Sequence, residues 1–190
     1  MLKGMPDADG VILATHPQKH FEIGSALLKA GIPVLIEKPV SLCPSQADEL
    51  VSLGGIAFAG HTRLYSPAWE RFKERVGEVR EVDCEAGGTH RDPWWDWGPH
   101  LVAMCLDIGF DPAKARIRVT KASRPLSFVV NGVHRFADVP TNPSPLEVLL
   151  WRFIAAIRKG EPNNDGLRLG AEVVRFLWDK KCHSPTTPQS

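Results

Sequence analysis

Two short apolar runs, separated by a helical pattern, constrain the fold of this chain most strongly. Residues 11–15 and 31–36 each contain a run of strand length, and between them apolar residues recur at helical spacing up to Gly31. A strand, a helix and a strand in this order form a right-handed βαβ unit. Both strands are apolar along their length, which is typical of a parallel sheet covered on two faces. The sequence therefore predicts an α/β fold.

The pattern changes near Gly77. Before it, we expect a helix at residues 41–53, a strand at 56–60 and a second helix at 67–76. After it, alternation indicates a strand at 78–86, and a helix is expected at 96–108. Asn131-Gly132 predicts a tight hairpin between two strands. Two amphipathic helices follow at 146–158 and 167–181. We expect a partial Rossmann-like parallel sheet at residues 1–77, followed by a small α+β domain with a mostly antiparallel sheet at residues 78–190.

Composition excludes several classes of protein. The formal net charge is +1, so nothing in the sequence indicates a nucleic-acid partner or a charged membrane surface. No apolar run approaches the roughly 20 residues of a membrane span. The four cysteines are scattered without a CxxC pair, which favours reduced thiols and a cytoplasmic protein. A metal site is not expected.

The strand at residues 31–36 ends in Glu37-Lys38-Pro39. In open α/β sheets, ligands bind beyond the carboxyl ends of the strands. A lysine at that point sits on a rigid element, and Pro39 biases Lys38 toward an extended backbone. This favours a presented catalytic group, although a single strand-end lysine is more often a solubilising charge.

These residues resemble those of a known family. Ala14-Thr15 followed by His20, then Ala30-Gly31 and Glu37-Lys38-Pro39, is similar to the glucose–fructose oxidoreductase / inositol dehydrogenase / MocA (Gfo/Idh/MocA) family. The resemblance continues through Gly60-His61-Thr62-Arg63 and Asp96-Trp97-Gly98-Pro99-His100, and covers nearly the whole chain. It implies an NAD(P)-dependent oxidoreductase acting on a CH–OH group of a sugar-like or polyol-like small molecule.

The resemblance also implies a set of site residues. Lys38, Asp96 and His100 would share catalysis, and the i, i+4 spacing of the last two puts them on one helix face. An ordinary exposed Asp–His contact is the alternative. The residues implied to contact NAD or NADP are Thr15, His16, His20, Glu37, Lys38 and Pro39, and those on the substrate side are Arg63, Trp95 and Trp97. Family members that oxidise polyols often carry an acid where this chain has Ala103, which puts a cyclitol substrate in doubt.

One feature of dinucleotide-binding folds is missing from the sequence. No GxGxxG occurs, although such a turn and the helix behind it normally hold the pyrophosphate. We therefore expect a truncated family member that binds NAD or NADP weakly by itself. A non-catalytic ligand-binding or dimerisation module is the first alternative, and a metal-dependent hydrolase using His16, His20, Asp96 and His100 is the second. Because a small amphipathic sheet exposes apolar surface, a homo-oligomer formed through the second sheet is also expected.

Overall fold

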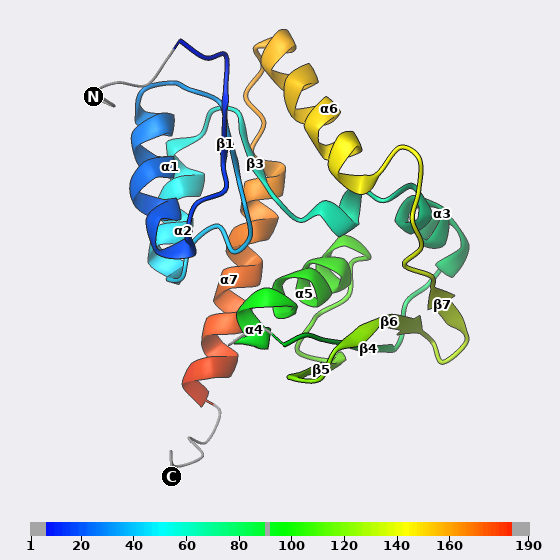
Figure 1. Ribbon diagram of the computed structural model, residues 1–190. Coiled ribbons are helices and arrows are strands. Elements are labelled where there is room, and N and C mark those ends of the chain that lie inside the picture. The colour runs from blue at the N-terminus through cyan, green and yellow to red at the C-terminus, as the bar shows by residue number, and fades with distance from the viewer. Residues whose placement is uncertain (1–6, 90–91, 184–190) are drawn as a thin grey trace.

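The computed structural model describes residues 7–89 and 92–183 (Figure 1). In the first part of the chain the elements are β1 (Val11–Leu13), a 3-10 turn (Pro17–Lys19), α1 (His20–Lys29), β2 (Val34–Ile36), α2 (Pro44–Leu53), β3 (Ala57–Ala59), a second 3-10 turn (Thr62–Tyr65) and α3 (Pro67–Val76). The three strands form a parallel sheet in the order β1-β2-β3. The predicted βαβ unit and partial Rossmann-like sheet are confirmed.

The second part contains β4 (Val82–Gly87), α4 (Pro93–Asp96), α5 (Gly98–Asp107), β5 (Arg116–Thr120), β6 (Arg124–Val130), β7 (His134–Phe136), α6 (Pro145–Lys159) and α7 (Asp165–His183). Its four strands pair in the order β5-β4-β6-β7, and only the β4–β5 pair is parallel. The predicted hairpin is present, with Asn131 and Gly132 both at positive φ. The expected single helix at 96–108 is divided at Trp97 into α4 and α5.

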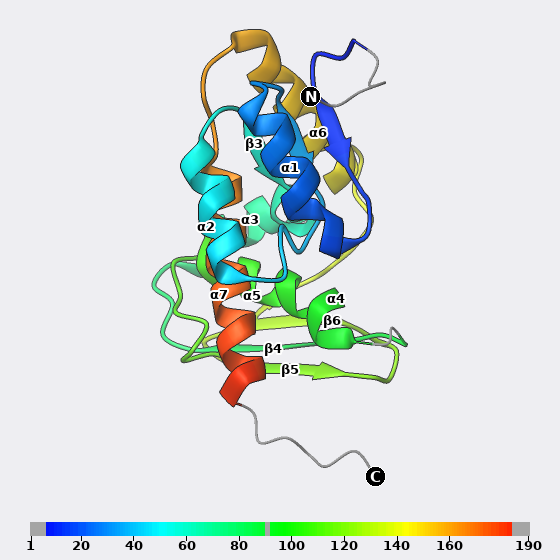
Figure 2. The ribbon, with the colours of Figure 1, turned by 90° about the vertical axis from the view of Figure 1, so that its left-hand side faces the viewer.

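Helices cover both faces of the first sheet (Figures 1 and 2). On one face α1, α2 and α7 enclose a core that includes Leu27, Leu50 and Leu167. On the other face α6 packs Leu149 and Phe153 against the middle of the sheet. The two C-terminal helices therefore return to the first sheet, although residues 78–190 were expected to pack as a domain of their own.

The second sheet buries one face under α3 and α5, with Trp69 at the centre of an aromatic cluster. Its other face is charged, because Asp83 and Glu85 on β4 form ion pairs with neighbouring arginines on β5 and β6. Among the described residues, this face therefore lacks the apolar surface that we expected. The large exposed apolar side chains of the described residues are Ile12, Val133, Val139, Leu146, Trp151, Ile154 and Trp178.

Candidate active site

Lys38 lies just beyond the carboxyl end of β2, where its ammonium group reaches α4. Its Nζ donates to the backbone oxygen of Asp96 at 2.8 Å and to the Oδ1 of the same residue at 2.9 Å. The Lys38 side chain is 17% exposed and that of Asp96 is 34% exposed. Charge-assisted hydrogen bonds between such partly desolvated groups are short and directional. The pair therefore fixes Lys38 and connects the end of β2 to α4, at the point where the sequence predicted a catalytic group.

A cleft of about 890 Å³ opens beside this ion pair, at the carboxyl ends of β1 and β2. Its lining residues are Ala14, Thr15, His16, Pro17, Gln18, Lys38, Pro39, Leu42, Asp92, Trp95, Asp96 and Trp178. Five of the residues implied by the family resemblance, besides Asp96, thus share one cavity. Trp178 comes from α7, 140 residues after Lys38, and nothing in the local sequence pattern pointed to it.

Two residues implied to contact a cofactor have other partners. His20 is 1% exposed, and its ring nitrogens lie 2.8 Å from the Pro39 oxygen and 2.9 Å from the Thr15 oxygen. The ring therefore connects the loops after β1 and β2 behind the cleft surface. The carboxylate of Glu37 accepts from the backbone N–H of Lys38 at 3.1 Å and packs over Gly60. Neither side chain lines the cleft. Both instead contact backbone groups of the loops that form its walls.

His100 lies near Lys38, but it is not part of the cleft lining. Its Nδ1 is buried and has no hydrogen-bond partner among the described residues. Burial and the positive charge of Lys38 hold the pKa of His100 well below its ordinary value. The ring is therefore neutral near pH 7, which is the form that accepts a proton.

His61 is the residue that sequence reasoning missed. It follows β3, is 2% exposed, and neither ring nitrogen has a partner among the described residues. Burial, followed by the charge of Lys38, lowers the pKa of His61 to about 4. Two histidines with depressed pKa values beside one lysine are typical of a functional site. The available signal was the position of His61 directly after a buried strand, the same position that Lys38 holds near β2.

Of the three residues expected on the substrate side, one lines the cleft and two do not. Arg63 forms an ion pair with Asp138, and its guanidinium lies 5.9 Å from the ring centre of Trp97. The Trp97 indole fills the space beside Gly88, where an added Cβ would approach Nε1 to 2.7 Å. Both side chains are thus engaged in packing at the edge of the site. Trp95 alone of the three lines the cleft.

The described residues offer no cluster of three or more histidine, cysteine or acidic side chains that could hold a metal ion. The metal-dependent alternative also required His20 as a ligand, and both of its nitrogens already face backbone carbonyls.

No helix within the described ranges has the length and apolarity needed to span a membrane.

Residues 1–54 match the sequence model of a family described as "Oxidoreductase family, NAD-binding Rossmann fold", the Gfo/Idh/MocA family. Over these residues the chain is similar to that family. The rhizopine catabolism protein MocA of Rhizobium meliloti is 26% identical over 130 residues, which are 68% of this chain and 36% of that protein. The uncharacterized oxidoreductase YdgJ of Escherichia coli K12 is 27% identical over 54% of this chain and 36% of its own length.

Solved structures of oxidoreductases share the fold of this chain. A protein from Magnetospirillum magnetotacticum MS-1, named as an oxidoreductase, superimposes with a TM-score of 0.77 at 26% identity, covering 91% of this chain and 80% of its own. The WlbA dehydrogenase of Thermus thermophilus, solved with NAD and UDP-GlcNAcA, gives a TM-score of 0.69 at 18% identity over 99% of this chain and 76% of its own. The matched stretches span about a third of the length of the curated relatives named above.

Proposed function

We propose that this chain provides the substrate and nicotinamide side of an NAD(P)-dependent oxidoreductase site that oxidises a CH–OH group. The observation that carries the proposal is the Lys38–Asp96 pair, at 2.9 Å, in the wall of a cleft at the carboxyl ends of two parallel strands. Ligands of open α/β sheets bind at this edge. The match of residues 1–54 to the model of an NAD-binding oxidoreductase family supports the same assignment.

The cleft fits one end of the cofactor. Thr15, His16 and Pro39 offer backbone and side-chain groups to a nicotinamide and its ribose, and a bound NAD(P) would take up the hydride of the substrate. The pyrophosphate is normally held at a glycine-rich turn and a helix N-terminus. Within the described residues, the loop after β1 instead leads through a Pro17–Lys19 turn into α1. The cradle for the phosphates is therefore not among these residues.

The protein groups that remain can position the substrate and take its proton. Lys38, held by Asp96, can donate a hydrogen bond to the hydroxyl oxygen that becomes a carbonyl oxygen. His100 is neutral near pH 7, because burial and Lys38 depress its pKa. Since His100 does not line the cleft, the released proton would reach it by way of Lys38. Withdrawal of charge by Lys38 and acceptance by His100 both favour loss of the proton from the hydroxyl group.

A sugar-like substrate is supported by the cleft and by the relatives. Trp95 offers an aromatic face of the kind that packs against sugar rings. A relative that is 27% identical over 43% of this chain and 28% of its own length is named a UDP-N-acetylglucosamine 3-dehydrogenase. At the position where the family resemblance led us to look for a second acid, Ala103 is fully buried. This favours a sugar derivative over a cyclitol held by two carboxylates.

Binding of the cofactor tests the geometric part of the proposal. We expect the chain by itself to bind NAD or NADP weakly, through the nicotinamide end, because the cleft offers groups to that end only. Saturation-transfer NMR should show contacts to nicotinamide protons that exceed those to adenine protons, and His16→Ala should reduce them. Micromolar or tighter calorimetric binding, with strong adenine contacts, would reveal a phosphate site outside this cleft.

Turnover tests the chemical part. The chain is incubated with NAD or NADP and a panel of sugars, nucleotide sugars, cyclitols and simple alcohols, and cofactor reduction is recorded. We expect reduction with a sugar-type member of the panel and its loss in Asp96→Asn, while the surface variant Glu22→Gln keeps it. Binding of a sugar without reduction of either cofactor would instead support the non-catalytic ligand-binding alternative.

A further inference from the structure

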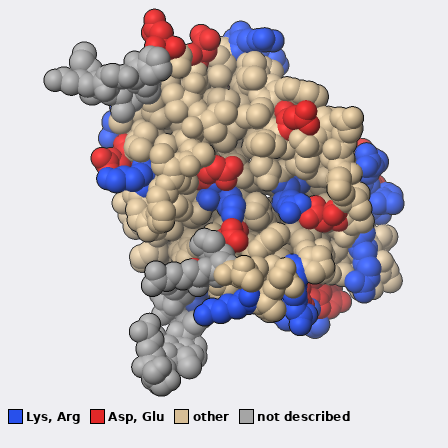
Figure 3. Space-filling model, in the orientation of Figure 1, with Lys and Arg blue, Asp and Glu red and all other residues tan. Residues whose placement is uncertain are grey.

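The outer side of α6 is an exposed apolar surface. Its inner side covers Leu35 and Phe58 of the first sheet, whereas Trp151 is 57% exposed and Ile154 is 44% exposed. In the space-filling view, the middle of the face formed by β1 and α6 carries few charged side chains (Figure 3). Contiguous apolar surface of this kind usually marks an interface.

The exposed side of α6 has an internal symmetry. Glu147, Trp151, Ile154 and Arg158 follow one another at spacings of 4, 3 and 4 residues, so they form a single stripe along the helix. A second α6 running in the opposite direction places position 147 opposite 158 and position 151 opposite 154. From this stripe we propose that two copies of the chain form a two-fold symmetric dimer through antiparallel α6 helices.

The charges at the ends of the stripe complement one another in this arrangement. Glu147 accepts from the backbone N–H of Ser144 at 2.8 Å and from its hydroxyl at 2.6 Å, which lowers the Glu147 pKa and holds the carboxylate in place. Arg158 has no ion-pair partner within the described residues. Each Glu147 would meet the Arg158 of the second copy, twice per dimer. A parallel arrangement would bring like charges together, so charge selects the antiparallel one.

The sheet next to α6 extends the same surface. Ile12 lies in register with Leu35 and Phe58, but α6 covers only the latter two, and Ile12 remains 54% exposed. The start of β1 lies against α6, because a Cβ at Gly10 would approach Ile157 Cδ1 to 2.7 Å. A second α6 beside the first would cover Ile12 as well.

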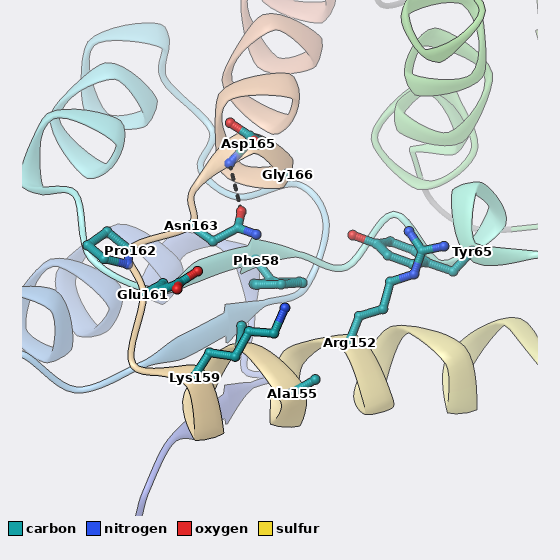
Figure 4. Close-up of a pocket in the computed structure, with 11 residues that line it drawn as sticks. Phe58, Tyr65, Arg152, Ala155, Lys159, Glu161, Pro162, Asn163, Asp165 and Gly166 are labelled. Carbon is teal, nitrogen blue, oxygen red and sulfur yellow. Dashed lines mark hydrogen bonds between the residues drawn. The ribbon is translucent and has the colours of Figure 1, made fainter.

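The opposite flank of α6 serves a different purpose. There Arg152 and Lys159 face a cavity of about 450 Å³ beside β3, together with Phe58 and Tyr65 (Figure 4). That flank carries charged side chains, so a dimer through apolar contacts of α6 must use the side that carries Trp151 and Ile154. The stripe is self-complementary, which is the requirement for an isologous two-fold contact.

Analytical ultracentrifugation of the full chain over a concentration series tests the dimer. We expect a monomer–dimer equilibrium in the unmodified chain. Trp151→Glu should raise the dissociation constant at least about tenfold, as expected for an aromatic residue at the centre of an interface. Val133→Glu, which replaces an exposed apolar residue outside the stripe, should leave it unchanged.

Charge exchange makes the test specific for the antiparallel pairing. Arg158→Glu should weaken the dimer by placing like charges opposite each other, and Glu147→Arg combined with Arg158→Glu should restore much of it. Lys159→Glu makes the same charge change one residue further along and serves as the matched control. Circular dichroism confirms that each variant is folded, since Glu147 also caps α6. A monomer at every concentration, or a dimer that resists both Trp151→Glu and Arg158→Glu, would overturn the proposal.

Discussion

Replacing Lys38 by alanine is expected to lower steady-state turnover at least about a hundredfold, the usual scale for a positioned acid–base group. In the cleft wall, the Lys38 ammonium group donates hydrogen bonds to the backbone oxygen of Asp96 at 2.8 Å and to its Oδ1 at 2.9 Å. Its removal leaves the substrate hydroxyl without a donor and frees the Asp96 carboxylate to move. The fold should persist, because Lys38 makes no contribution to the apolar core. The assay is cofactor reduction with the best substrate of the panel described above.

Two further variants separate chemistry from structure. Lys38→Met keeps the length of the side chain without its charge and should be as inactive as Lys38→Ala. Lys29→Ala removes a surface lysine that pairs with Glu49 and should retain full turnover. If Lys38→Ala turns over substrate at the rate of the unmodified chain, the lysine has no catalytic role and the proposed site is wrong.

Acidification is expected to destabilise the chain through His61. The folded pKa of His61 is about 4, lowered by burial and by Lys38, whereas an unfolded histidine titrates near 6.5. As the pH falls from about 6.5 to about 4, the unfolded state binds a proton that the folded state does not. The free energy of unfolding should therefore fall by up to about 1.4 kcal/mol per pH unit over this window. His100 acts in the same direction.

Urea denaturation at a series of pH values from 7 to 4 measures this effect. In His61→Phe the loss of stability toward acid should be smaller, because one of the two buried groups no longer titrates. The phenyl ring also removes two buried nitrogens without partners. His16→Phe, at an exposed position, controls for the general effect of replacing an imidazole ring. An acid dependence that is the same with and without His61 would show that the ring is solvated in solution.

The regular elements could be predicted because their signals are local. A parallel βαβ unit is predicted by the apolar runs at 11–15 and 31–36 and by the helical spacing between them. The hairpin between β6 and β7 is predicted by Asn131-Gly132. The cleft followed from the same logic, because strand ends in a parallel sheet meet at one edge. Lys38 and Asp96, which are 58 residues apart, were therefore expected in one site, and the structure brings them together.

Contacts between distant segments could not be predicted from local sequence. His20 and Glu37 are close in sequence to residues that line the cleft. Their side chains, however, contact backbone groups of Pro39 and Lys38. Sequence periodicity also does not reveal which sheet a helix covers, so the return of α6 and α7 to the first sheet was not foreseen. The outer face of the second sheet is closed by cross-strand ion pairs, which an alternating pattern alone does not distinguish from apolar exposure.

The long helix α7 has a mechanical consequence. Its first half packs Leu167 and Ala171 into the core of the parallel sheet, and its second half packs Val173 and Leu177 against α5 of the other sheet (Figures 1 and 2). At 1.5 Å per residue, this uninterrupted helix is about 28 Å long, and its packed side chains lie between Leu167 and Leu177. A hinge opening between the two sheets would have to bend or detach it. Substrate entry must therefore rely on side chains and loops around the cleft, and the two sheets should lose their structure in a single cooperative step.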